Sequence, residues 1–192
     1  LGSRRDPASV ATALREVLYD RALVRAAPAG APEAGGVLLG EVLETGVGNC
    51  VGLSALGFCI AEEAGIPLRG ARFPGHFFLE IPDDRPDPYW FETTALGRRM
   101  DRRAYERIWH PSEESRSCGV YLRPEGERAV LAEVLNIRAR RRRDAGDIEG
   151  AMQDMDRAVA LDPEWPPHHV NRGGLYLRAG RAPGARPTRS GT

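Results

Sequence analysis

Three side chains that could together perform nucleophilic chemistry are Cys50, His76 and Glu92. A cysteine thiolate attacks a carbonyl carbon, an imidazole transfers the proton, and a carboxylate orients the imidazole. Cys50 follows a glycine-rich turn and stands at the expected start of an apolar helix, where backbone N–H groups and the helix dipole favour the thiolate. We therefore predict acyl transfer at an amide or related bond. Gly48, Asn49 and the backbone N–H of Cys50 are the candidates for substrate and oxyanion binding.

The strand pattern places His76 and Glu92 on one face of a hairpin. Residues 76–81 and 89–94 are rich in aromatic and aliphatic side chains, and the two candidates share a face when each run is extended. A hairpin centred on Asp84 sets His76 directly opposite Glu92, within contact distance. Glu92 would then fix the tautomer of His76 and stabilise its protonated form.

The other cysteines and histidines have less suitable settings. Cys59 lies on the side of the same helix opposite the candidate nucleophile, and Cys118 lies in or beside a strand, so both are predicted to be small buried side chains. His110 is expected in a loop, and His168 and His169 are expected on a helix surface. The cysteine spacing contains no zinc or redox pair, which indicates a reducing compartment. No nucleotide loop or calcium loop is present, so we predict no cofactor and no metal.

The elements that must position these residues mix helices with short strands, which predicts an α+β domain. The helix over 50–64 is apolar on nearly every face and is expected in the core. The other predicted elements of this part are helices at about 8–24, 37–44 and 98–109, strands at 68–73, 76–81, 89–94 and 118–122, and a polar loop at 111–117.

From residue 129 only helices are predicted, at about 130–144, 147–160 and 165–179. The Asp-Ala-Gly at 144–146 recurs as Arg-Ala-Gly at 178–180, a period of 34 residues that is typical of tetratricopeptide repeats. The predicted organisation is therefore a cysteine domain over 1–126, repeat-like helices over 127–180 and a disordered tail over 181–192.

The charge balance of 27 basic and 27 acidic residues argues against nucleic acid and anionic membranes as partners. No apolar stretch is long enough to span a membrane and the first residues lack a signal peptide pattern, so the expected location is the cytoplasm. All basic residues are Arg, and Gln153 is the single Gln. The chain is therefore a poor substrate for its own Gln-to-Lys crosslinking.

Three separated motifs in this order resemble the bacterial transglutaminase-like family related to the SirB1 proteins, whose members often carry tetratricopeptide repeats. The motifs are Gly-Asn-Cys-Val-Gly-Leu-Ser at 48–54, Pro-Gly-His-Phe at 74–77, and Glu-Thr-Thr at 92–94 with Gly97. The resemblance covers roughly residues 35–180. It implies a papain-like fold in which a buried helix packs on a small antiparallel sheet, with Cys50 as nucleophile, His76 as base and Glu92 as orienting acid. In the family the third position is more often Asp, so Glu92 departs from the usual pattern.

Two functions are compatible with these features. The first is cysteine-dependent acyl transfer, as a protease, amidase or transglutaminase, on a protein, a peptide or a small amide. The alternative is a catalytically silent scaffold whose repeat helices bind a peptide or protein partner. Thiol reactivity separates the two, because only the enzyme requires a fast thiol at Cys50 that depends on His76.

Overall fold

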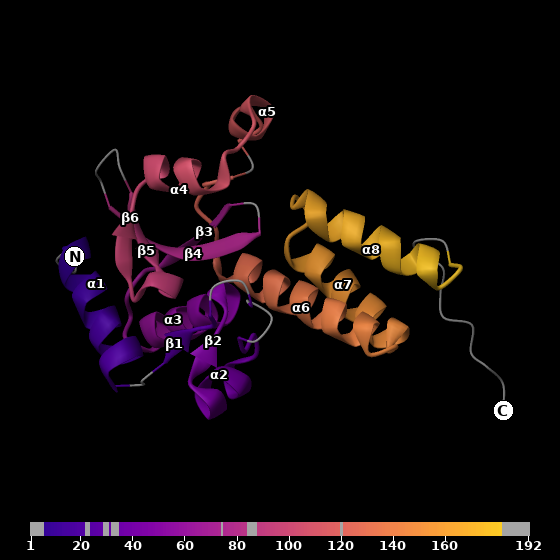
Figure 1. The fold of residues 1–192 in the computed structure, drawn as a ribbon, viewed down its shortest axis with the longest axis horizontal. Helices are drawn as coiled ribbons and strands as arrows, with labels where there is room; N and C mark the ends of the chain where they lie inside the picture. Colours follow the sequence, from indigo (N-terminus) through magenta and orange to yellow (C-terminus); the bar gives the residue numbers. More distant parts are fainter. Residues whose placement is uncertain are drawn as a thin grey trace. The chain divides into compact units, whose positions relative to one another are not determined.

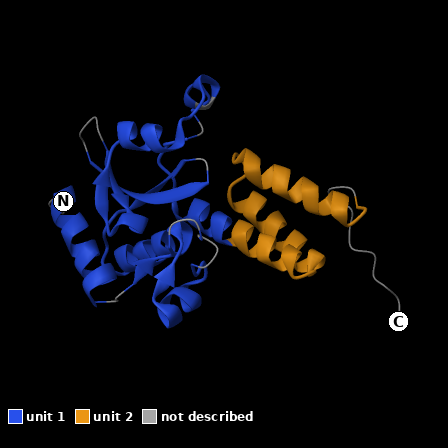
Figure 2. Ribbon diagram, viewed as in Figure 1, with its two compact units in different colours: residues 1–134 blue, residues 135–192 orange. Residues whose placement is uncertain are grey.

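The computed structural model describes residues 6–21, 24–28, 31, 35–73, 75–83, 88–119 and 121–181, with the backbone alone at 115. The chain divides into two compact units, residues 1–134 and 135–192 (Figure 2). The division falls inside helix α6 (Glu127–Asp144), whereas the sequence places the domain boundary where this helix begins. Predictions that concern Pro74, the hairpin turn at 84–87 and the tail after 181 lie outside the described residues.

The N-terminal part of the first unit contains the helices up to and including the apolar segment. They are α1 (Pro7–Arg15), continued by the π-helix η1 (Glu16–Arg21), then α2 (Leu39–Thr45) and α3 (Cys50–Glu63). The predicted helix at 50–64 is thus confirmed. A short parallel pair, β1 (Arg25–Ala26) with β2 (Val47–Gly48), leads the chain into α3.

A four-stranded antiparallel sheet forms the centre of this unit, in the order β3-β4-β5-β6 (Figure 1). The strands are β3 (Arg69–Phe73), β4 (His76–Ile81), β5 (Tyr89–Glu92) and β6 (Arg98–Met100). The prediction that the segment from Arg98 onwards is helical is wrong for its first residues, which pair with β5. Leu96 and Gly97 have positive φ angles of 54° and 71°, so the chain reverses there and returns as a strand. Asp101 then caps helix α4 (Arg102–Trp109).

The register of the β4–β5 hairpin differs from the prediction. Leu79 pairs with Phe91 and Ile81 with Tyr89, so continuing the register sets Glu92 opposite Phe78 rather than opposite His76. A hairpin centred on Asp84 would have paired Pro88 within the ladder, where it has no N–H to donate. His76 and Glu92 consequently lie diagonally across the two strands, on the same face.

The sheet has a hydrophobic cluster on each face. Leu79 and Phe91 pack with Leu14 of α1 and Leu53 of α3. On the opposite face, Phe78 and Trp90 pack with Tyr105 of α4. Figure 1 shows α3 and α4 on opposite sides of the strands. The mixed helix and sheet architecture agrees with the predicted α+β class.

Three predictions about the exposed periphery of this unit are wrong. The loop at 111–117 contains a short helix, α5 (Glu113–Ser117), and no strand forms over the described part of 118–122. Leu122 has a positive φ of 59°, which is incompatible with a regular strand, and its N–H bonds to the carbonyl of Arg72. Cys59 and Cys118 are exposed rather than buried, because Cys59 faces outward near the end of α3 and Cys118 follows α5 in a turn.

The second unit consists of the last turns of α6 with α7 (Ile148–Leu161) and α8 (Pro166–Arg178), so the three predicted helices are confirmed. Buried Asp154 of α7 receives two hydrogen bonds from Arg138 of α6, at 2.8 and 2.6 Å. His168 is fully buried, contrary to its predicted surface position, because it lies on the side of α8 that also buries Leu175. His169 is exposed as expected. Among the described helices, none combines the length and apolar character needed to cross a membrane.

Candidate active site

The first turn of α3 fixes the position of Cys50, the first residue of this 14-residue helix. The side-chain oxygen of Asn49 accepts hydrogen bonds from the N–H groups of Val51, at 3.0 Å, and Gly52, at 2.9 Å, which caps the helix. The Cys50 side chain is half-buried at the positive end of the helix dipole, which stabilises a negative charge.

Gly48 and Asn49, predicted beside the substrate, have positioning roles in the structure. Gly48 pairs with β1, and the N–H of Asn49 donates to the carbonyl of Gly36 at 3.1 Å. A Cβ atom on Gly48 would lie 2.9 Å from the side chain of Leu53, so this position accepts only glycine without a shift of its neighbour. Contact of Gly48 and Asn49 with substrate stays a prediction.

His76 lies between the other two candidate residues. Its Nε2 atom is 2.7 Å from Oε2 of Glu92, so Nδ1 is the ring nitrogen available to the Cys50 sulfur. Burial opposes protonation of the ring, but hydrogen bonds to Cys50 and Glu92 and their negative charges raise the pKa of His76 from 6.5 to about 10. The imidazole is therefore protonated at neutral pH. The structure thus brings Cys50, His76 and Glu92 together, although by a diagonal contact rather than the direct one predicted.

The Glu92 carboxylate receives four hydrogen bonds. Oε2 accepts from His76 and from the hydroxyl of Tyr105, at 2.6 Å. Oε1 accepts from the backbone N–H and the hydroxyl of Thr94, at 2.8 and 2.6 Å. Burial alone would raise the pKa of Glu92, but the hydrogen bonds and the charge of His76 outweigh it and lower that pKa. Glu92 is therefore held as a carboxylate.

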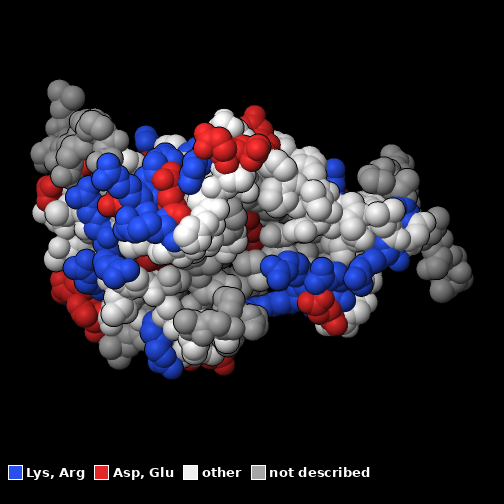
Figure 3. All heavy atoms as spheres, turned by 45° about the horizontal axis from the view of Figure 1, so that its top comes forward, with Lys and Arg blue, Asp and Glu red and all other residues white. Residues whose placement is uncertain are grey.

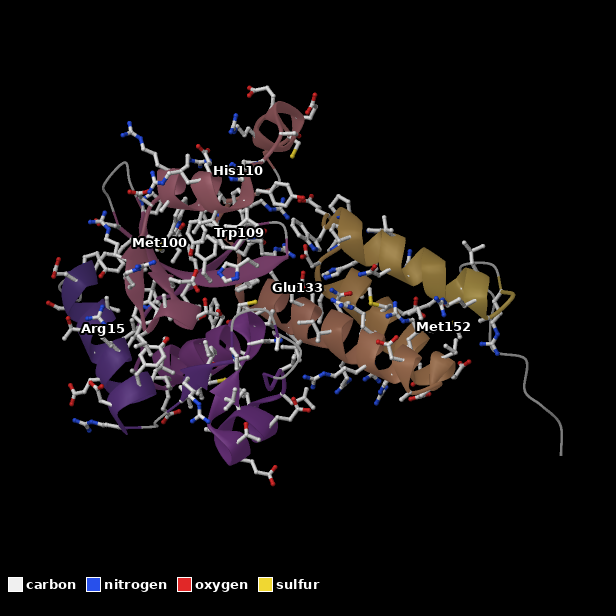
Figure 4. The ribbon with its side chains drawn as sticks, viewed as in Figure 1. Arg15, Met100, Trp109, His110, Glu133 and Met152 are labelled. Carbon is white, nitrogen blue, oxygen red and sulfur yellow. The ribbon has the colours of Figure 1, made fainter. Side chains whose placement is uncertain are left out.

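Aromatic side chains pack against the ring of His76. The ring of Trp109 stacks on His76 with centroids 4.9 Å apart, and Phe78 lies 5.9 Å from the same ring. Figure 4 shows Trp109 beneath α4, on the side toward the strands. His110, predicted in a loop, ends α4 with a φ of 44° and is exposed.

The outer surface around β6 and α4 is basic. Figure 3 shows Arg side chains gathered over this part of the first unit, with acidic side chains among them. The exposed arginines here are Arg98, Arg99, Arg102, Arg103 and Arg107.

Tyr105 and Trp109 were not predicted as site residues, but from α4 Tyr105 bonds to Glu92 and Trp109 stacks on His76. Their spacing of four residues places both aromatic side chains on one face of α4, and this spacing could have predicted that they contact the same neighbour. Thr94 lies within the Glu-Thr-Thr motif, but no sequence pattern predicted its hydrogen bonds to Glu92. Within the described ranges, His, Cys, Asp and Glu side chains form no group of three or more suited to a metal ion.

The sequence of this chain is similar to those of known proteins. Residues 1–136 match a family model described as the transglutaminase-like superfamily. UPF0162 proteins from two Xylella fastidiosa strains, Temecula1 and 9a5c, are each 28% identical over 151 and 152 residues, which is 77% of this chain and 54% of each relative. The UPF0162 protein PA3419 of Pseudomonas aeruginosa strain PAO1 is 30% identical over 145 residues, which is 72% of this chain and 51% of that relative.

The chain thus spans about half the length of the curated relatives it matches. No solved structure matches the chain. The family model covers the entire segment that contains Cys50, His76 and Glu92 and extends over most of the chain. The chain therefore belongs to the transglutaminase-like superfamily.

Proposed function

We propose that this chain is a cysteine-dependent acyl-transfer enzyme acting on an amide bond. The supporting observation is that His76 contacts both other residues. Its ring forms a hydrogen bond with the Cys50 side chain, and its Nε2 lies 2.7 Å from Oε2 of Glu92. A cysteine at a helix start, paired with an imidazolium, is the activated form of this nucleophile.

The proposed reaction has two steps. The Cys50 thiolate forms a bond to the carbonyl carbon, and the tetrahedral intermediate collapses as His76 donates its proton to the leaving nitrogen and the C–N bond breaks. Water or an amine then attacks the thioester, His76 takes the proton of the attacking group, and the C–S bond breaks to restore the thiolate. Glu92 keeps the imidazole oriented in both steps. The backbone N–H of Cys50, with Asn49 and Gly48 close by, is the proposed oxyanion and substrate site.

Acylation by p-nitrophenyl acetate tests this proposal without knowledge of the natural substrate. We expect p-nitrophenol release with more than one turnover, and an acetyl group on Cys50 in peptide mass spectra of quenched samples. His76→Ala should slow release by at least about 100-fold, the usual contribution of general acid–base catalysis. Cys59 and Cys118 are more exposed thiols in the same chain and serve as internal controls. Equal release by Cys50→Ala and the unmodified protein would refute the proposal.

The second proposal is that the C-terminal helices bind a peptide or protein partner, with or without catalysis in the first unit. Val170 and Leu177 of α8 are 72% and 82% exposed, and their spacing of seven residues places them on the same side of the helix. We further propose that these helices are tetratricopeptide repeats, that the chain belongs to the SirB1-related branch of the family, and that the protein is located in the cytoplasm. If Cys50 shows no special reactivity, this scaffold function is the one to pursue.

A further inference from the structure

Tyr105 is a buried phenol whose hydroxyl is directed at the candidate site. Its side chain is fully buried in α4, and its ring stacks on Phe78 with centroids 4.2 Å apart and meets Trp90 edge-on. Packing alone would be satisfied by phenylalanine. The hydroxyl instead donates to Oε2 of Glu92 at 2.6 Å, so it has a specific polar partner.

The hydroxyl completes the hydrogen bonding of the carboxylate. An ionised carboxylate offers about four acceptor directions, two on each oxygen. Thr94 uses the two on Oε1, and His76 and Tyr105 use the two on Oε2. With all four directions occupied, the carboxylate has one orientation, and that orientation presents Oε2 to the imidazole.

We propose that Tyr105 is a positioning residue, which keeps Glu92 ionised and aimed at His76 through its hydroxyl. This inference rests on the proposed function, because it assigns a role within the same site. Tyr105 acts only through Glu92 and exchanges no proton with the substrate in this proposal.

The phenol is a donor throughout the working pH range. Burial, followed by the charge of Glu92, raises the pKa of Tyr105, so the hydroxyl does not ionise where the site would operate. The other titratable or charged groups around Glu92 come from four further elements: Cys50 of α3, His76 of β4, Tyr19 of η1 and Arg98 of β6. Of these, His76 contacts the same oxygen as Tyr105.

The test uses Tyr105→Phe, which removes the hydroxyl and keeps the ring. The matched control is Tyr176→Phe, which removes a phenol hydroxyl bonded to Asp156 at 2.9 Å in the second unit. Two measurements are made on each protein: the rate of Cys50 alkylation by iodoacetamide from pH 4 to pH 9, and the NMR titration of His76.

Loss of one charge-assisted hydrogen bond should slow alkylation near pH 6 by roughly tenfold and move its acid limb about one pH unit upward. The pKa of His76 should fall in Tyr105→Phe, and Tyr176→Phe should match the unmodified protein in both measurements. A lower melting temperature with both pH profiles unchanged would show a merely structural role and overturn the inference.

The two measurements separate failure of this inference from failure of the proposed function. If the Cys50 of the unmodified protein reacts as an ordinary thiol, the proposed function fails, whatever Tyr105 does. The NMR titration still judges Tyr105 in that case, because it reports the Glu92–His76 contact without requiring a reactive thiol. An unchanged or higher pKa of His76 in Tyr105→Phe overturns the positioning role.

Discussion

Replacing Glu92 by Gln removes the negative charge beside His76 while keeping the shape of the side chain. The pKa of His76 lies at about 10 against 6.5 for an ordinary imidazole, which corresponds to roughly 5 kcal/mol in favour of the imidazolium at 1.36 kcal/mol per pH unit. Burial opposes this preference, so Cys50 and Glu92 supply all of it. An opposite charge in contact usually shifts a pKa by about one to three pH units, so Glu92→Gln should lower the pKa of His76 by an amount in that range.

NMR titration of protein labelled at histidine carbon measures this change directly. The chain has four histidines, and the signal that disappears in His76→Ala identifies the one of interest. Glu80→Gln is the matched control, because Glu80 is also buried in the sheet but bonds to the indole N–H of Trp90 at 3.1 Å. The electrostatic reasoning would be refuted if His76 titrated near pH 6.5 in the unmodified protein, or if Glu92→Gln left the pKa of His76 unchanged.

Three further predictions concern stability. Gly52→Ala places a methyl group against a backbone carbonyl in the chain before α2, so we expect overpacking of about 1–3 kcal/mol and a lower melting temperature. Asp154→Ala removes the buried acceptor of Arg138, and chemical denaturation should show a loss of about 1–3 kcal/mol that exposed Asp144→Ala does not produce. Because the pKa of folded His76 is raised, its stabilising contribution is complete below pH 6.5 and is lost as pH rises through about 10. The unfolding free energy of the unmodified protein should therefore fall between pH 6.5 and about 10 relative to that of His76→Ala. The same pH dependence of the unfolding free energy in both proteins would contradict a raised pKa of His76.

The proximity of Cys50, His76 and Glu92 could be predicted because local patterns determine where these residues lie. A glycine-rich turn before a continuous apolar run fixes the start of α3, and the side-chain alternation of the strands fixes the shared face of His76 and Glu92. Both features depend on neighbours in sequence, which a single chain displays. The longer side chain of Glu92, compared with aspartate, suits the diagonal contact that the structure contains.

Tertiary contacts account for what the sequence did not predict. The strand at Arg98–Met100 has no apolar alternation of its own and forms because it pairs with the edge of β5. Tyr105 is identifiable as a partner of Glu92 only after α4 is folded over the sheet. The burial of His168 and the exposure of Cys59 likewise depend on which side of a helix meets a neighbour.

The most direct test of the proposed thiolate–imidazolium site is the pH dependence of iodoacetamide alkylation, located by peptide mass spectrometry, in the unmodified protein and in His76→Ala. Half-buried Cys50 should react below pH 7 faster than exposed Cys59 and Cys118, and His76→Ala should abolish this advantage. The site would be contradicted if Cys50 reacted slowly, with the pH profile of an ordinary thiol of pKa about 8.5, and if His76→Ala left its rate unchanged.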